Sequence, residues 1–120
     1  MDTITRAYFK NLLLERLDDL YSKAAEMTAD LTGSEDNFAD PADRATAESD
    51  INFTLSILER ERKLVVKIHQ TLQKIEEGNF GECERCGDDI GLERLKARPV
   101  TTLCIECKRR QEAAERIRGL

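Results

Sequence analysis

The sequence predicts a mainly α protein: an antiparallel coiled-coil helical hairpin, a small zinc-knuckle base built on four cysteines, and a C-terminal helix. Three observations lead to this prediction. Apolar residues recur at alternating spacings of four and three over two long segments, no glycine or proline interrupts either segment, and two CxxC pairs follow them. Charged residues make up 36% of the 120 residues and aromatic residues only 5%, which suits exposed helices that each bury one stripe.

The first helix is expected over residues 3–32, which contain neither glycine nor proline. Its apolar residues step by 4, 3, 4, 3 and 4, the a/d seam of a coiled coil. These seam residues are Leu13, Leu17, Leu20, Ala24, Met27 and Leu31. Phe9 and Ile4 extend the predicted seam toward the N-terminus.

The second helix is expected from about Pro41 to Glu77, which makes it ~55 Å long at 1.5 Å per residue. The same spacing places these residues in its seam: Ile51, Leu55, Leu58, Arg62, Val65, His69 and Leu72. A neighbouring stripe widens the apolar face: Ile57, Leu64, Ile68 and Ile75. Two such helices bury their seams by packing antiparallel, so residues 1–77 should form a hairpin with its tip at about residues 32–45.

The tip is acidic. Asp40, Pro41 and Asp43 read as the N-cap, N1 and N3 positions of the second helix, and capping alone explains both acids. The two acids also belong to a larger cluster in which Arg44 is the one base between residues 30 and 50. The acids of this cluster are Asp30, Glu35, Asp36, Asp40, Asp43, Glu48 and Asp50. Such a charge suits a basic partner, so a structural and a functional interpretation both stand.

The cysteines form two pairs, "CERC" at Cys83 and Cys86 and "CIEC" at Cys104 and Cys107, separated by seventeen residues. This spacing is typical of a zinc site, because two tight CxxC turns supply a tetrahedral set of four thiolates. A thioredoxin-like redox motif is the alternative, and it would need a βαβ context that this sequence lacks. Four protein ligands leave no position for a catalytic water, so we expect one structural Zn²⁺ within a base of residues 78–120.

Between the cysteine pairs, five apolar residues should pack around the metal: Ile90, Leu92, Leu95, Val100 and Leu103. The segment "CKRRQEAAERIRGL" predicts the final helix. His69 is expected to be a helix residue rather than a metal ligand, because the cysteines already complete the zinc site.

Charge and targeting signals narrow the function. Residues 1–50 carry 12 acids and 5 bases, and residues 51–120 carry 12 acids and 14 bases. An acidic half disfavours DNA binding by the whole molecule. The start "MDTITRAYFK" lacks the pattern of a signal peptide, and no apolar run reaches membrane-spanning length. We therefore expect a cytoplasmic protein that does not bind a membrane, with reduced cysteines.

Taken together, "DPADRA" at the tip, "RERKL" on the second helix and "GNFGECERCGDDIGLERLKARPVTTLCIECK" resemble the DksA/TraR family of RNA polymerase-binding transcription factors, and within it the DksA members. The resemblance implies a regulator that is not an enzyme and that binds RNA polymerase. Its coiled coil would enter the secondary channel and alter open-complex stability. Partnership with the alarmone ppGpp would repress ribosomal RNA promoters and activate others, as in the stringent response.

Carried over by position, the resemblance assigns the tip residues to Asp40, Asp43 and Ala45. It assigns a ppGpp site at the polymerase interface to basic residues at four positions: Arg60, Lys67, Arg98 and Lys108. Ile57 departs from the pattern, since the best-known members have an asparagine there.

Two other functions remain open from the sequence. Gre-like factors also use an acidic coiled-coil tip, to hold a catalytic Mg²⁺ for transcript cleavage, but they generally lack four zinc-binding cysteines. A zinc-ribbon DNA-binding protein is the other alternative, and it predicts salt-sensitive DNA affinity.

Overall fold

A computed structural model describes residues 2–33 and 41–119. In this part of the chain the order of elements is α1 (Thr3–Gly33), α2 (Pro41–Glu77), α3 (Leu92–Ala97) and α4 (Ile105–Ile117). One isolated antiparallel bridge joins Glu82 to Asp89. The mainly α prediction is confirmed, and the ends of α2 fall at the predicted residues.

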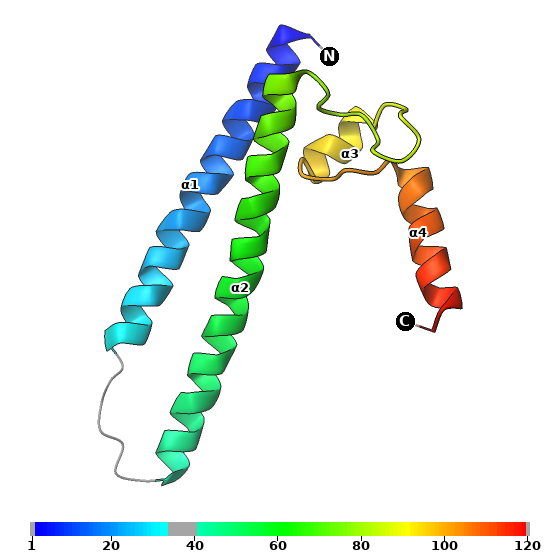
Figure 1. Ribbon diagram of the computed structural model, residues 1–120. Helices are drawn as coiled ribbons and strands as arrows, with labels where there is room; N and C mark the ends of the chain where they lie inside the picture. The colour runs from blue at the N-terminus through cyan, green and yellow to red at the C-terminus, as the bar shows by residue number, and fades with distance from the viewer. Residues whose placement is uncertain (1, 34–40, 120) are drawn as a thin grey trace. The chain divides into compact units, whose positions relative to one another are not determined.

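The chain divides into two compact units, and α1 and α2 each contribute to both. The first unit comprises Met1–Leu13 and His69–Leu120, and the second comprises Leu14–Ile68. Within each unit α1 and α2 lie side by side and run in opposite directions (Figure 1). No helix in the described part of the chain has the length and apolarity needed to cross a membrane.

The seam of α1 follows the predicted phase. Phe9, Leu13 and Leu17 are buried. The next seam residues toward the tip are half-buried: Leu20, Ala24, Met27 and Leu31. Ile4 does not extend the seam, since it remains 82% exposed. Asp2 instead fixes the start of the helix, because its Oδ1 accepts a hydrogen bond of 2.7 Å from the Thr5 amide.

The seam of α2 differs from the prediction by a shift in phase. Leu55 is 48% exposed, and Arg62 and His69 are also exposed, so their assignment to the seam is wrong. The less exposed residues still step by three and four, but they include polar side chains. The seam with this spacing comprises Ala47, Ile51, Thr54, Leu58, Glu61, Val65, Ile68, Leu72 and Ile75, and Ile57, Thr71 and Lys74 beside it are also buried or half-buried. Hydrophobicity favoured Leu55 over Thr54, and the spacing from Leu55 and Leu58 then placed Arg62 rather than Glu61 in the seam.

Helix α2 ends in a Schellman motif. Gly78 has a φ of 86°, which L side chains rarely adopt, and its amide donates to the Ile75 carbonyl at 3.3 Å. The Asn79 amide donates to the Lys74 carbonyl at 3.1 Å. The turn ends α2 at the predicted glycine and starts the segment that carries the first cysteine pair.

Candidate functional site

The four cysteines come together in the first unit. Their sulfur atoms all lie within 4.8 Å of one another, and Cys86 Sγ and Cys104 Sγ are 3.8 Å apart. A tetrahedral zinc site with Zn–S bonds of about 2.3 Å places its sulfurs about 3.8 Å apart. The donor set and its spacing therefore fit one Zn²⁺, which would be held by Cys83, Cys86, Cys104 and Cys107.

The first pair is shaped by a tight turn. The Gly87 amide donates to the Cys83 carbonyl at 3.0 Å, and the Cys83 amide donates to the Asp88 carbonyl at 2.8 Å. Gly87 has a φ of 78°, a conformation that favours glycine. This turn brings Cys83 and Cys86 to the same side of the chain.

The second pair is positioned by the start of α4. Cys104 is the N-cap residue, and its Sγ accepts a hydrogen bond of 3.5 Å from the Cys107 amide. Cys104 thus both caps a helix and offers a ligand to the metal.

The surrounding protein shifts the pKa values of the two buried cysteines, Cys83 and Cys107, in opposite directions. Hydrogen bonds from the backbone amides of Cys86 and Cys104 lower the pKa of Cys83 to about 6. Burial raises the pKa of Cys107 to about 12. A cation that replaces the Cys107 proton is therefore needed to keep this sulfur ionised at neutral pH.

Arg94, which the sequence reasoning missed, supports the second pair from α3. Its Nε donates to the Leu103 carbonyl at 3.0 Å, and its guanidinium also donates to Thr101 Oγ1 at 3.2 Å. The backbone just before Cys104 is thereby held to α3. Of the five apolar residues predicted to surround the metal, Ile90 and Leu95 are buried. Val100 and Leu103 are half-buried and Leu92 is exposed.

The cysteine segment also contacts the ends of α1 and α2 within the first unit. The rings of Phe9 and Phe80 lie 5.1 Å apart, and Lys74 forms an ion pair with Glu84, the residue after Cys83. Arg6 donates to the Ile75 carbonyl at 2.6 Å. The first two contacts join the segment that carries the first cysteine pair to the helices, and the third joins α1 to α2 beneath it.

Of the predicted tip residues, Asp43 and Ala45 belong to the second unit. Asp43 lies in the first turn of α2, and both Asp43 and Ala45 are exposed. Asp40 lies outside the described residues. The exposed acid at the start of α2 is compatible with a structural role at the dipole and with a contact to a basic partner.

The four predicted basic positions are divided between the units. Arg60 and Lys67 are exposed on α2 in the second unit, close in sequence to the half-buried Ile57. Arg98 and Lys108 belong to the first unit. Arg98 is exposed at the end of α3, and Lys108 is half-buried and donates to Gln111 at 3.3 Å. Their assignment to one ppGpp site stays a prediction.

Comparison with known families gives two adjacent matches. Residues 5–75 match the DnaK suppressor protein DksA N-terminal domain, and residues 78–113 match the prokaryotic dksA/traR C4-type zinc finger. The second match covers all four clustered cysteines, so the site is identified as a zinc-finger site with one structural zinc.

Curated relatives span most of the chain. A protein of Caulobacter vibrioides named RNA polymerase-binding transcription factor DksA is 41% identical over 110 residues, which are 92% of this chain and 78% of the relative. A protein of the same name from Escherichia coli strain K12 is 39% identical over 116 residues, 97% of this chain and 77% of the relative.

A solved structure agrees with these matches. Transcription factor DksA2 from Pseudomonas aeruginosa superposes with a TM-score of 0.88 at 40% identity, covering 97% of this chain and 89% of that one. A Chlamydia trachomatis structure at 24% identity and a TM-score of 0.57 supports the fold alone. The two domain matches, the identity to the curated relatives and the clustered cysteines agree: the chain belongs to the DksA family.

Proposed function

We propose that this chain regulates transcription by binding RNA polymerase directly, without catalysing a reaction of its own. The observation that carries the proposal is the identity of 41% to a relative named for this binding, over 92% of the chain. The closed set of four cysteine ligands agrees with a non-catalytic metal. Such a protein would work in the cytoplasm, where the polymerase is.

The proposal gives different tasks to two parts of the chain. Residues 1–77 would act as the probe that enters the secondary channel, and residues 78–120 as the base. The boundary between the matched domains, at residues 75 and 78, supports this division. Bound zinc would stabilise the base by cross-linking its two CxxC turns, while the residues of α1 and α2 make the contacts in the channel.

The proposed working end is the tip, with Asp40, Asp43 and Ala45. Its acidity supports the proposal, because residues 1–50 carry 12 acids and 5 bases. A carboxylate placed near basic or metal-binding groups of the polymerase active centre would change the stability of the open complex. Asp43 is exposed, so its charge can reach a partner.

We further propose that ppGpp binds between the chain and the polymerase, with basic contacts from Arg60, Lys67, Arg98 and Lys108. Multiple cations suit a ligand with several phosphates. The test is ppGpp binding to the assembled complex. Exchange of Arg60 for alanine should weaken ppGpp binding, whereas exchange of Lys63, an exposed lysine outside the proposed set, should not.

The experiment that tests the main proposal is transcription from a ribosomal RNA promoter with purified polymerase. Wild type should bind the polymerase and repress this promoter. Asp43→Asn should repress less even when enough protein is added to saturate the polymerase, whereas Asp19→Asn, a change at an exposed acid on α1, should repress normally. Equal repression by all three proteins would remove the tip from the mechanism, and absence of polymerase binding by wild type would overturn the function itself.

The same preparation separates the proposal from a Gre-like activity. Arrested, backtracked complexes should not be cleaved faster when the protein is added. Cleavage that depends on Asp43 would identify the tip as a metal-holding catalytic end instead.

A further inference from the structure

The coiled-coil seam of the second unit does not close near the tip. Leu17 and Ile68 are buried, with exposures of 8% and 1%. Leu31 lies two heptads beyond Leu17, Ile51 lies in the same α2 seam as Ile68 but nearer the tip, and both Leu31 and Ile51 are only half-buried. Among the described residues, the seam is therefore less closely packed at this end than around Leu17 and Ile68.

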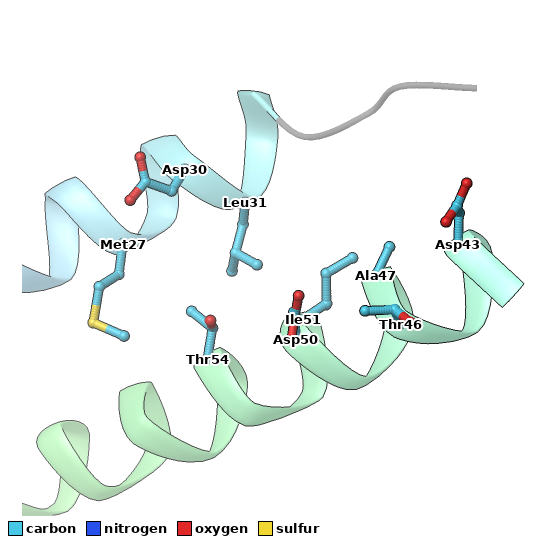
Figure 2. A pocket seen from close by; sticks show the side chains of 9 residues that line it. All are labelled: Met27, Asp30, Leu31, Asp43, Thr46, Ala47, Asp50, Ile51 and Thr54. Carbon is cyan, nitrogen blue, oxygen red and sulfur yellow. The ribbon is translucent and has the colours of Figure 1, made fainter. Parts of the chain in front are cut away.

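Between the two helices at this end lies an open groove of about 590 Å³. Figure 2 shows Met27 and Leu31 reaching from α1 toward α2, with Ala47 and Ile51 on the facing side of α2. These four side chains form the apolar floor of the groove.

The groove has a cause in the sequence. Ala47 and Thr54 occupy seam positions of α2 where a coiled coil commonly carries leucine or isoleucine, and both line the groove. Their side chains are too small to fill the space between the helices. The groove is therefore a consequence of the small side chains at these two positions.

The rim of the groove is acidic. Asp30 on α1 and Asp43 and Asp50 on α2 line it, and its described lining contains no lysine or arginine. An apolar floor beneath three carboxylates is complementary to a segment that presents one large aliphatic side chain with a lysine or arginine within one helical turn.

We propose that this groove is a docking site for such a basic amphipathic segment of RNA polymerase, with its aliphatic side chain seated between Leu31 and Ile51. The proposal rests on the proposed polymerase binding and adds the chemistry of the contact. Burial of an apolar anchor supplies affinity, and the carboxylates orient the basic partner and accelerate its association. Asp43 then works as part of a rim rather than as a lone charge.

The first test fills the groove. Ala47→Leu and Thr54→Leu place a larger side chain in the empty seam, so both proteins should keep their helical content and melt no lower than wild type. Their affinity for purified polymerase, measured by competition with labelled wild type, should fall at least tenfold. Ala25→Leu adds the same side chain at an exposed position outside the groove and should bind normally.

The second test changes the rim. Asp50→Asn should weaken binding severalfold and reduce its dependence on salt, while Glu48→Gln, an exposed acid that does not line the groove, should not. Asp50→Asn leaves the apolar floor intact, so it still tests the docking proposal if Ala47→Leu or Thr54→Leu fails to fold.

Photo-crosslinking identifies the occupant. A benzoylphenylalanine at position 46, an exposed residue that lines the groove, should crosslink to a polymerase peptide that contains an aliphatic residue near a lysine or arginine, and one at position 25 should not. Normal binding by both filled variants, or crosslinks between two copies of this chain, would overturn the docking proposal while wild-type polymerase binding stands. If wild type itself fails to bind, the proposed function has failed.

Discussion

Lys23 Nζ on α1 and Glu61 Oε1 on α2 lie 3.1 Å apart and form an ion pair within the second unit. Glu61 occupies a seam position and keeps only 19% of its side-chain exposure, whereas Lys23 keeps 55%. A partly desolvated carboxylate paired with a solvated ammonium contributes little net stability. The hairpin therefore carries a polar residue where an apolar one would pack better.

Replacement of Glu61 by leucine should stabilise the hairpin by about 1 kcal/mol, because it restores an apolar seam layer and removes a partly buried charge. Thermal unfolding followed by circular dichroism measures the change. Arg62→Leu is the matched control, since this neighbour is exposed and should give no gain. A larger gain from Arg62→Leu would contradict the seam that the structure assigns to α2.

Gly87→Ala should weaken zinc binding without any steric clash. Gly87 has a φ of 78°, and a Cβ there would meet no atom within 4 Å, so the cost of about 1 kcal/mol comes from backbone conformation alone. A competition titration with a chromophoric chelator should show affinity reduced about fivefold. Gly91→Ala also adds a Cβ in open space, but with φ at −57° it should bind zinc like wild type. Equal affinities for all three proteins would show that the turn tolerates side chains.

Removal of zinc should loosen the first unit selectively. A chelator at neutral pH should take one zinc per chain, after which the buried Cys107 thiol, whose pKa burial raises to about 12, regains its proton. Hydrogen exchange should then accelerate at the start of α4, where the metal no longer holds the N-cap residue Cys104, while the amides around Leu17 stay protected. Uniform acceleration along the whole chain would contradict this division.

Asp2 should make the start of α1 sensitive to acid. Hydrogen bonds from Thr5 hold the pKa of Asp2 below its ordinary value, so its stabilising effect is present above that ordinary value and is lost as the pH falls through the lowered pKa. The NMR shift of the Thr5 amide should report this titration. Asp2→Asn should keep the amide shift nearly constant over the same range, and a wild-type midpoint above the ordinary aspartate value would contradict the hydrogen bond.

The sequence predicted the elements better than their contacts. Proline at N1 and glycine at the C-terminal end mark the two ends of α2, and both signals act within a few residues. The phase of its seam was mispredicted because Leu55 and Glu61 have the wrong polarity for their positions, and only the partner helix reveals which face is covered. Helix α3 was missed because six residues carry too little periodicity, and its place depends on the hydrogen bonds of Arg94.

The zinc site could be predicted almost fully, because two CxxC pairs at this spacing specify both the ligands and the geometry. The residues that support the site could not be predicted. Arg94, Glu84 and Phe80 are ordinary residues in the sequence, and they act through partners that lie near them only in the folded chain. The groove was missed for the same reason, since small residues at Ala47 and Thr54 have no meaning until their heptad positions are known.

The distribution of burial along the hairpin determines how the chain can fold. The well-buried residues Phe9 and Ile75 lie where segments far apart in sequence pair, beside the exposed ion pair of Lys10 and Glu76, whose partners are 66 positions apart. The pairings nearest the connecting segment border the open groove and offer little apolar burial. Closing the longer loop costs only about 0.5 kcal/mol more than the 38-residue loop between Lys23 and Glu61. The folding nucleus should therefore form where the start of α1 meets the end of α2, and pairing should spread from there toward the connecting segment. The folding rate should then be limited by the search for these contacts between residues far apart in sequence.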